Sequence, residues 1–359
     1  MSTLNVNKIA DASGGVLAPI SSVMRNRIIN GAMVINQRAF SGSMTTAGDS
    51  LYTLDRWRGY FFLNDKYSVS QNAGSVTPPA GFTNYLGVTS SAATTVASGS
   101  YFMIRQTIEG YNIADLGWGT ANAKTVTLSF WVRSSLTGTF GGSLENSAGT
   151  YSYPFSYTIS SANTWEQKSI TISGQTSGSW ATNNTAGLIM QFSLGVGSSL
   201  QGTANTWANA EYWSVTGETQ IVGTSGATWY VTGVQLEVGT QATGFEYRQY
   251  GQELALCQRY YETLGFGLLG VANSSTGIWA QMLFKVEKRA TPTVGLFTTT
   301  QTWGQFGVSN RTSSSVSIGD SANTNNSGSI TRIEGFSSMT ANAPLGSLTS
   351  TVFTLSAEL

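Results

Sequence analysis

The sequence of 359 residues holds no histidine and a single cysteine, Cys257. Without histidine the chain can build neither a Ser-His-Asp triad nor a Cys-His dyad, and it has no imidazole ligand for zinc or haem. A reactive thiol needs a helix N-terminus, a neighbouring cation or a base, whereas Cys257 lies in the middle of an expected helix and Arg259 points to another face. We therefore interpret Cys257 as a buried structural residue and predict a protein without enzymatic activity, cofactor or bound metal.

Carboxylates are the main remaining candidates for catalysis. A glycoside hydrolase needs two of them about 5–10 Å apart, and the sequence offers Glu237 with Glu246, or Asp49 with Asp55. Because no spacing distinguishes either pair, we predict structural or surface roles for them and keep a glycan depolymerase as an alternative. Turn-rich segments with Asn and Asp could also hold a structural Ca²⁺, but the sequence has no EF-hand loop and assigns no ligands.

Aromatic side chains are the most direct sign of ligand binding. Sugars stack on Trp and Tyr rings while amides and carboxylates bind their hydroxyl groups, and the chain has 10 tryptophans. Trp131 and Arg133 lie on the polar side of an expected strand, and Trp279 and Trp303 lie in surroundings rich in Gly, Ser and Thr. These four residues form the candidate ligand-binding set, with packing in a core as the alternative role of each tryptophan.

Charged residues make up only 10% of the chain, against about 25% in ordinary soluble proteins, and the formal net charge is zero. No basic cluster is longer than KVEKR at 285–289, so we predict no binding to nucleic acid. No run of 18 apolar residues is present, so no membrane insertion is expected. The first residues lack an apolar secretory stretch, which indicates synthesis in a cytoplasm.

Residues 29–246 consist of short segments in which apolar and polar residues alternate, separated by turn residues. The clearest segment is TVTLSFWVRSS at 125–135, in which every second residue from Val126 is apolar. Further strands are expected at 152–160, 168–174 and 187–197. Many short strands and almost no helical periodicity predict an all-β fold, a jelly-roll β-sandwich.

The segment LYTLDRWRGYFF at 51–62 combines charged residues with Trp57. We interpret it as a strand of the sandwich. In that strand Trp57 would pack inward while Arg56 and Arg58 would point to solvent.

A short helix interrupts the β pattern. Tyr250, Leu254, Cys257 and Tyr261 follow helical spacing and predict a connecting helix over 247–264, with these four side chains on its buried side. In a trimer, three copies of this side could meet near the axis.

Two further segments complete the expected domain organisation. Residues 1–28 form a leader too short to bury itself, so we expect it to pack against a partner. Residues 265–359 alternate again, as in 280–290, and predict a second, smaller β-sandwich domain. That domain contains a polar tract at 309–329, whose order the sequence leaves open.

Five segments in order resemble phage tail-fibre and related receptor-binding virion proteins, especially those of phages with marine and cyanobacterial hosts. They are NRIINGAMVINQRA (26–39), LDRWRGY (54–60), SFWVRSS (129–135), GVQLEVGTQATGFEYRQYGQELALCQRYYE (233–262) and KRATPTV (288–294). The resemblance covers about residues 26–294, and its most specific part is the run from QLE to CQRYYE.

The resemblance implies a carbohydrate-binding-module-like jelly roll, a connecting helix, a variable C-terminal domain at the tip, and a homotrimer. It supplies no catalytic residues. The leader resembles short virion-attachment segments, which implies docking to other virion proteins and a location in the virion as a tail or head fibre. Residues 265–359 would then bind host surface polysaccharide. A capsid-bound head fibre or decoration protein is the alternative, because the chain has no long shaft.

The placement of Cys257 near a trimer axis gives a first prediction. Cys257→Ala should leave assembly and ligand binding nearly intact, because the thiol contributes only packing. Cys257→Arg should disrupt the trimer, because a guanidinium group cannot be buried among apolar side chains without a partner. Sedimentation of both variants measures the effect, and an undisturbed trimer in Cys257→Arg would contradict the placement.

Overall fold

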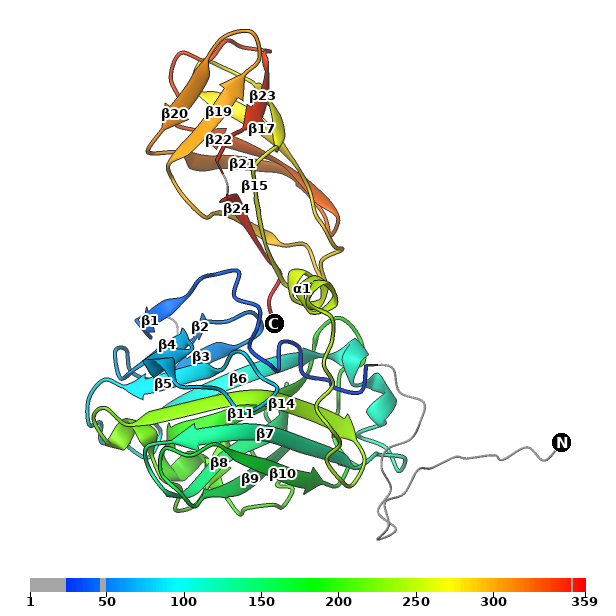
Figure 1. Ribbon diagram of the computed structural model, residues 1–359. Helices are drawn as coiled ribbons and strands as arrows, with labels where there is room; N and C mark the ends of the chain where they lie inside the picture. The colour runs from blue at the N-terminus through cyan, green and yellow to red at the C-terminus, as the bar shows by residue number, and fades with distance from the viewer. Residues whose placement is uncertain (1–23, 46–49, 350) are drawn as a thin grey trace, which may run out of the picture. The chain divides into compact units, whose positions relative to one another are not determined.

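The computed structural model describes residues 24–45, 50–349 and 351–359, and its regular structure is almost entirely β-strand (Figure 1). The chain forms two compact units: unit 1, which extends to Gln249 and includes Leu359, and unit 2, Tyr250–Glu358. The predicted all-β class is confirmed, with a β-sandwich of the jelly-roll kind in unit 1 and a smaller second β-sandwich in unit 2. Residues 1–23 of the expected leader, and Asp49, lie outside the described residues.

Unit 1 consists of two six-stranded antiparallel sheets, whose strands can be followed in Figure 1. The first sheet has the order β1 (Ser41–Ser43), β4 (Tyr67–Gln71), β5 (Leu86–Ser90), β14 (Thr228–Val238), β7 (Val126–Ser134) and β10 (Glu166–Ile172). The second sheet has the order β2 (Ser50–Tyr52), β3 (Arg58–Phe61), β6 (Tyr101–Glu109), β11 (Ala186–Val196), β8 (Gly138–Asn146) and β9 (Ser152–Ile159).

One apolar core lies between these two sheets. The apolar face of β7, which the sequence predicted, is fully buried, and its members are Val126, Leu128, Phe130 and Val132. The facing side of β11 is equally apolar, with Leu188, Met190 and Phe192 fully buried. Each such side chain removed from water contributes about 1.5–3 kcal/mol. The strands expected at 152–160, 168–174 and 187–197 are confirmed as β9, β10 and β11.

The segment 51–62 differs from its prediction in one respect. Trp57 is fully buried as expected, but Arg56 is also buried, and its Nη2 donates a hydrogen bond to the carbonyl oxygen of Thr107. The reason is a turn between β2 and β3, in which Arg56 has a positive φ of 69°. A turn breaks the alternation of a strand, so the outward prediction was wrong for Arg56, while Arg58 on β3 is half-buried.

Buried side-chain amides fix the first described segment of unit 1 between the two sheets. Asn26 donates from Nδ2 to the carbonyl oxygen of Val234 and accepts through Oδ1 from the amide of Leu236, at 3.0 Å each. Gln106 on β6 donates to the carbonyl oxygen of Ile29 and accepts from its amide, at 2.9 Å each. These bonds supply the partners that a regular strand would obtain from a ladder.

Asn30 continues this network, which we call the amide lock (the side chains of Asn26, Asn30 and Gln106). Its Nδ2 donates to the carbonyl oxygens of Ile35 at 2.8 Å and Asp55 at 3.0 Å, and its Oδ1 accepts from the amide of Ile35. Trp57 Nε1 donates to the carbonyl oxygen of Asn30 at 3.0 Å. The lock therefore ties the turn before β3 to the core.

A β-bulge in β14 makes room for the amide lock. The register of β14 against β7 shifts between Thr232 and Gln235, and Gly233 has a φ of 62°. The amide of Val234 is thereby free to donate to the carbonyl oxygen of Gly31. A Cβ at Gly31 would lie 2.1 Å from the carbonyl oxygen of Val234, so only glycine fits there.

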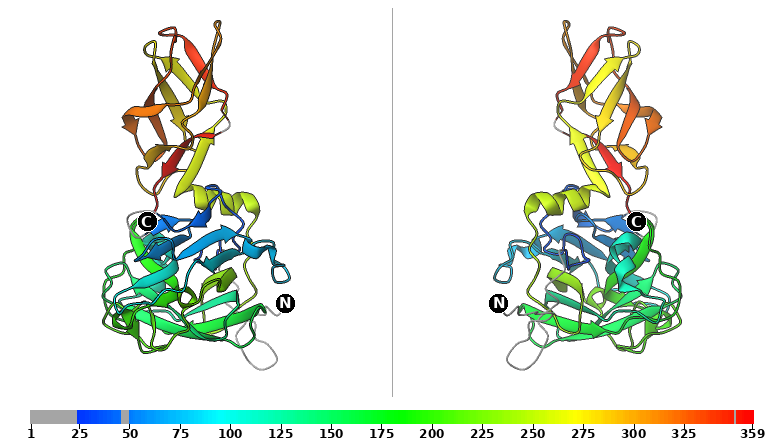
Figure 2. Two further views of the ribbon diagram at one scale, coloured as in Figure 1. Left: turned by 90° about the vertical axis from the view of Figure 1, so that its left-hand side faces the viewer. Right: turned by 90° about the vertical axis from the view of Figure 1, so that its right-hand side faces the viewer.

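Unit 2 contains a short helix and two sheets, seen from two sides in Figure 2. The helix is α1 (Tyr250–Gln258). The three-stranded sheet has the order β15 (Tyr261–Gly265), β24 (Thr351–Ser356) and β18 (Thr293–Leu296). The seven-stranded sheet has the order β20 (Asn310–Ser313), β19 (Gln301–Gln305), β23 (Pro344–Ser347), β16 (Leu269–Ala272), β17 (Gly277–Leu283), β22 (Gly328–Glu334) and β21 (Ser317–Thr324). The polar tract at 309–329 is thus largely strand.

The helix is shorter than predicted, and the predicted stripe is not one helical face. Tyr261 belongs to β15, which pairs with β24, because aromatic and β-branched residues here favour a strand once a partner strand is present. Tyr250 is 64% exposed and Leu254 is half-buried. Cys257 is buried and forms no disulfide, in agreement with its predicted structural role.

Two segments of the family resemblance meet inside unit 2. Glu262, from CQRYYE, and Lys288, from KRATPTV, form an ion pair that is fully buried. Lys288 Nζ also donates to the carbonyl oxygen of Gln258 at 2.6 Å. Replacing either residue alone would leave the charge of the other buried without a partner, which strongly destabilises the folded state.

The amide lock gives a stability prediction. Asn30→Ala removes three hydrogen bonds and leaves the buried amide of Ile35 without a partner, so we expect a loss of about 3 kcal/mol in the free energy of unfolding. Asn122→Ala is the matched control, because Asn122 is exposed. Urea unfolding of both variants measures the difference, and equal stabilities would show that the lock is dispensable.

Candidate functional site

The second sheet of unit 1 carries arginine and tyrosine on the side that faces away from the core. Along β3 and β6, inward Phe61, Phe102 and Ile104 alternate with the side chains of this outer face. Arg58 lies opposite Arg105 across the β3–β6 ladder, and Arg105 lies opposite Gln191 on β11. Residues far apart in the sequence therefore form one row across the sheet.

Four of these side chains, together with Trp213, form a compact group, which we call the arginine–tyrosine cluster (Arg58, Tyr60, Tyr101, Arg105 and Trp213). The rings of Tyr60 and Tyr101 are stacked with their centroids 4.8 Å apart and an interplanar angle of 17°. The guanidinium carbon of Arg105 lies 3.7 Å from the centroid of Tyr60. Trp213 meets the ring of Tyr101 edge-on at 4.8 Å. Such contacts orient both tyrosines rigidly.

Aromatic and basic residues extend the cluster along the same face. The ring of Tyr52 on β2 has the guanidinium carbons of Arg38 at 5.0 Å and Arg58 at 5.7 Å. Phe62, which follows β3, is 52% exposed and lies 5.9 Å from Tyr101. The outer layer is thus partly open to solvent, with Tyr60, Tyr101 and Arg58 half-buried.

Polar side chains beneath this layer are buried without a full set of hydrogen bonds. Arg105 is 5% exposed, Glu145 on β8 is 2% exposed and Gln191 is fully buried. Among the described residues, no hydrogen-bond partner is present for Arg105 Nε and Nη2 or Gln191 Oε1. The side chains of Trp213 and Gln191 interact with the carboxylate of Glu145 and oppose the rise of its pKa. Buried polar atoms without partners are uncommon, and each calls for an explanation such as a bound water, ion or ligand. This combination singles out the face as a candidate binding site.

Burial changes the protonation of the buried pair. It raises the pKa of Glu145 to about 7, an effect that the charge of Arg105 opposes. It lowers the pKa of Arg105 to about 10, where Glu145 acts in the opposite direction and Arg58 in the same direction. At neutral pH Arg105 is therefore a cation, while burial favours the protonated form of Glu145. Because the carboxyl group of Glu145 carries less than a full negative charge, the net charge of this face is more positive than its numbers of Arg and Glu side chains indicate.

A short parallel pair of strands, β12 (Gln201–Gly202) and β13 (Ser214–Val215), places Trp213 over the cluster. Glu218 anchors this loop: its Oε1 accepts from Ser193 Oγ at 2.8 Å and from the amide of Val196 at 2.7 Å, and its Oε2 accepts from Ser214 Oγ. Burial raises the pKa of Glu218 to about 7, against these hydrogen bonds.

The four predicted ligand-binding residues do not come together. Trp131 and Arg133 lie on β7 in the first sheet, both half-buried, and Arg133 donates to the carbonyl oxygen of Asn163 and stacks near Tyr230. Trp303 on β19 is fully buried in the core of unit 2, so its assignment as a ligand platform was wrong. Trp279 on β17 lines an apolar hollow described below.

The carboxylate pairs considered for catalysis have structural partners. Glu237 accepts from Gln235 and Thr243, and Glu246 accepts from the amides of residues 25 and 26. Asp55 accepts from the amide and side chain of Gln37. The predicted structural roles are thus observed for these three carboxylates. Within the described ranges, no three His, Cys, Asp or Glu side chains gather as a metal site would require.

The arginine–tyrosine cluster was missed because its members are spread over 156 positions of sequence, from Arg58 to Trp213. A local signal was present in the alternation of Arg58 with Tyr60 and of Tyr101, Met103 and Arg105. Each alternation identifies an outward face, but only strand pairing brings the two faces together.

Comparison with known proteins gives distant structural likenesses. No protein-family model and no curated protein matches the sequence. The solved structures that resemble the chain include the enzymatically active domain of tailspike protein 4 of bacteriophage CBA120, with 12% identity over 60% of this chain and 22% of that chain and a TM-score of 0.34.

Two others are sugar-binding domains by their descriptions. One is a family 11 carbohydrate-binding module from Clostridium thermocellum, solved with a beta-1,3-1,4-mixed-linked tetrasaccharide, with 12% identity over 56% of this chain and 98% of that chain and a TM-score of 0.28. The other is the N-terminal cellulose-binding domain of Cellulomonas fimi beta-1,4-glucanase C, with 14% identity over 50% and 91% and a TM-score of 0.23. TM-scores this low leave the function to be argued from the residues of this chain.

The raised pKa values of Glu145 and Glu218 predict a pH-dependent stability. Between their ordinary pKa of 4.5 and about 7, the folded protein keeps protons that the unfolded chain has released, so stability falls as pH rises through this window. Glu145→Gln and Glu218→Gln should each reduce that loss, by up to about 3 kcal/mol. Urea unfolding at a series of pH values measures the slope.

Glu166→Gln is the matched control for these two variants. A hydrogen bond from Lys168 lowers the pKa of Glu166, so the stability it contributes is lost only as pH falls below 4.5. The free energy of unfolding of Glu145→Gln and Glu218→Gln could instead fall with pH between 4.5 and about 7 as steeply as that of the parent protein. Both carboxylates would then be ionised in the folded state, and the raised pKa values would be refuted.

Proposed function

We propose that unit 1 binds a glycan through the arginine–tyrosine cluster. The observation that carries the proposal is the stacked pair of Tyr60 and Tyr101, held rigid by Arg105 and Trp213 and half-open to solvent. A fixed aromatic surface with hydroxyl and guanidinium groups at its margin suits a sugar, whose apolar ring face stacks on aromatic rings while its hydroxyl groups need hydrogen-bond partners. Such a surface costs little conformational entropy on binding.

The charge of the face favours a glycan that carries carboxylates. Arg58 is half-buried and lies within reach of both Tyr52 and Tyr60, so its guanidinium can pair with a carboxylate in the bidentate geometry that arginine prefers. Arg105 adds a second positive charge beneath it, and Glu145, with its pKa raised to about 7 by burial, offsets that charge only in part.

The glycan belongs to the surface of a host cell, and the chain acts without catalysis in the virion as a tail or head fibre. The support for this part is the order of the five sequence segments shared with phage receptor-binding proteins. Homotrimer formation and the docking of residues 1–28 to other virion proteins rest on the same resemblance. The ligand site is placed on unit 1 rather than on residues 265–359, because Trp303 is buried and the surroundings of Trp279 are apolar.

A glycan depolymerase is the second candidate function, and Glu145 is the observation that favours it. Its raised pKa, near 7, is that of a general acid at neutral pH. The carboxylate of Glu211 is close enough to contribute to that shift and is exposed. Formation of new reducing ends from polysaccharide, lost in Glu145→Gln, would establish this function in place of simple binding.

Arg58→Ala tests the binding proposal. We expect at least about tenfold weaker binding to a uronic-acid polysaccharide, because a charge-assisted hydrogen bond contributes about 1.5–3 kcal/mol. Tyr101→Ala should weaken binding to neutral and acidic polysaccharides alike, because it removes the stacking surface. Isothermal titration against bacterial surface polysaccharides with and without uronic acids provides the measurement.

Arg133→Ala is the matched control, because Arg133 is also half-buried and also lies against a tyrosine ring, but in the first sheet. It should bind like the parent protein. Equal affinity of all three variants, or no binding of any polysaccharide by the parent, would refute the site.

A further inference from the structure

Part of the outer face of the seven-stranded sheet of unit 2 is apolar, over β16, β17 and the adjoining parts of β19, β22 and β23. Along β17, Ile278, Ala280 and Met282 point into the core, while Trp279 and Leu283 point outward with Gln281 between them. An antiparallel sheet with one solvated face normally carries polar residues there. Several outward residues of this sheet are apolar instead, beside the polar Thr302 on β19 and the charged Arg332 and Glu334 on β22.

The apolar outward residues come from five neighbouring structural segments. They are Leu269 and Val271 of β16, Trp279 and Leu283 of β17, Ile330 of β22, Phe306 after β19, and Pro344 and Leu348 in and after β23. We call this group the apolar sheet face. Leu283 is 73% exposed, Phe306 63% and Leu269 61%. Large apolar side chains this exposed are ordinarily scattered singly on a protein surface, not gathered on one face.

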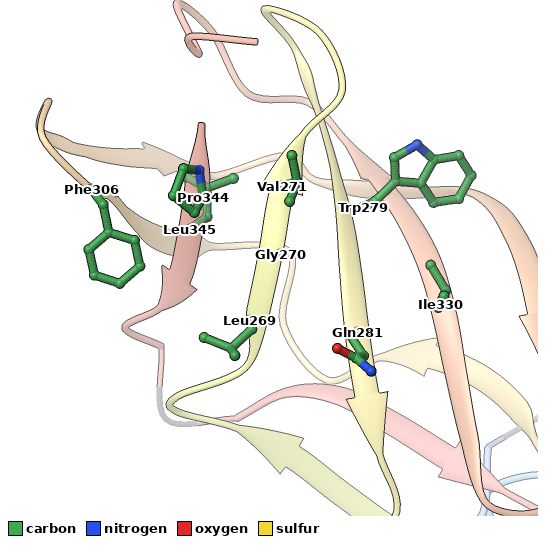
Figure 3. Close-up of a pocket in the computed structure, with 9 residues that line it drawn as sticks. All are labelled: Leu269, Gly270, Val271, Trp279, Gln281, Phe306, Ile330, Pro344 and Leu345. Carbon is green, nitrogen blue, oxygen red and sulfur yellow. The ribbon is translucent and has the colours of Figure 1, made fainter. Parts of the chain in front are cut away.

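The middle of the apolar sheet face is hollowed. Figure 3 shows Phe306 and Pro344 on one side of the hollow, Trp279 and Ile330 on the other, and Leu269 and Val271 between them. The volume of the hollow is about 400 Å³. Gln281 supplies the one amide side chain of its lining. A sugar would leave most of its hydroxyl groups without partners here, so the hollow fits an apolar side chain instead.

The extent of the face matches an interface between proteins. Its exposed side chains leave on the order of several hundred Å² of apolar surface in water, which reaches the largest patch usual for a monomer, about 300–600 Å². A standard interface buries about 800 Å² on each partner. The area is therefore enough for a specific contact once the surrounding polar rim is included.

Charge and shape make a second copy of the same chain the fitting partner. On β22 the outward charged residues, Arg332 and Glu334, pair with each other, so identical faces would not repel. The outward positions next to Phe306 and Leu348 are Gly304 and Gly346, which allow another backbone or side chain to approach closely. The projecting Phe306 and Leu283 can fill the hollow of a facing copy, as a self-complementary contact requires.

We propose that the apolar sheet face of unit 2 is an interface between copies of this chain. The contact uses unit 2 alone and does not depend on glycan binding by unit 1. A self-complementary face pairs two copies, so this contact is distinct from the homotrimer that the sequence resemblance implies.

Leu269→Glu and Phe306→Glu in the full chain test the proposal. Both residues are exposed, so each variant should fold with an unchanged circular dichroism spectrum and melting temperature. Each should weaken self-association by about a hundredfold or more, because every contact would bury carboxylates without partners. Sedimentation velocity over a concentration series gives the association constant and the number of copies.

Phe297→Glu is the matched control, since Phe297 is 45% exposed and adjoins the three-stranded sheet instead. It should associate like the parent protein. A parent protein that stays monomeric throughout the concentration series would overturn the proposal, as would Leu269→Glu and Phe306→Glu variants that associate as tightly as the parent. A monomeric parent that cosediments with phosphatidylcholine vesicles would assign the face to lipid instead.

Discussion

The amide lock is the constraint on which unit 1 depends. Asn26, Asn30 and Gln106 bury amide groups between two apolar sheets and satisfy a stretch of backbone that has no strand ladder. Because Asn30 also binds the carbonyl oxygen of Asp55, the lock sets where β3 begins. It thereby determines the register that places Arg58 opposite Arg105 and makes the cluster possible. A site formed from three separate segments needs such a fixed reference, since small displacements would separate its rings.

Charged residues are few in this chain, and the two units differ in the side chains that cover the outer face of one of their sheets. Unit 1 covers its second sheet with arginine and tyrosine, whose rings and guanidinium groups pack together while their polar atoms face outward or down to Glu145. Unit 2 leaves part of the outer face of its large sheet apolar. The first surface suits a hydrated, hydroxyl-rich ligand and the second suits a protein. One chain thus carries two surfaces of opposite chemistry, each on a rigid sheet rather than on loops.

Alternation within a strand was sufficient to predict β7, and a continuous apolar run was sufficient to predict β11, because each signal lies within a few neighbouring residues. It was insufficient at Arg56, where a turn with positive φ reverses the direction of the side chain, and at Tyr261, where pairing with β24 outweighs helical spacing. Alternation also gave no information about Trp303. Its sequence neighbours are Gly, Ser and Thr, which do not indicate whether the indole points into the core or to solvent. The cluster depends on register between distant strands, which a single sequence does not encode locally.

The segments on which the resemblance to phage receptor-binding proteins rests mostly form internal contacts that hold the fold together. Asn26, Asn30 and Gly31 belong to one of them, and Glu262 and Lys288 join two others inside unit 2. None of these five side chains belongs to the arginine–tyrosine cluster or the apolar sheet face. The segment LDRWRGY is the exception, because it holds Arg58 and Tyr60 of the arginine–tyrosine cluster. The recognisable residues therefore belong mostly to the internal frame of the fold. A few substitutions at outward positions can therefore alter which ligand such a fold binds. The buried hydrogen bonds and the ion pair that stabilise the fold would stay unchanged.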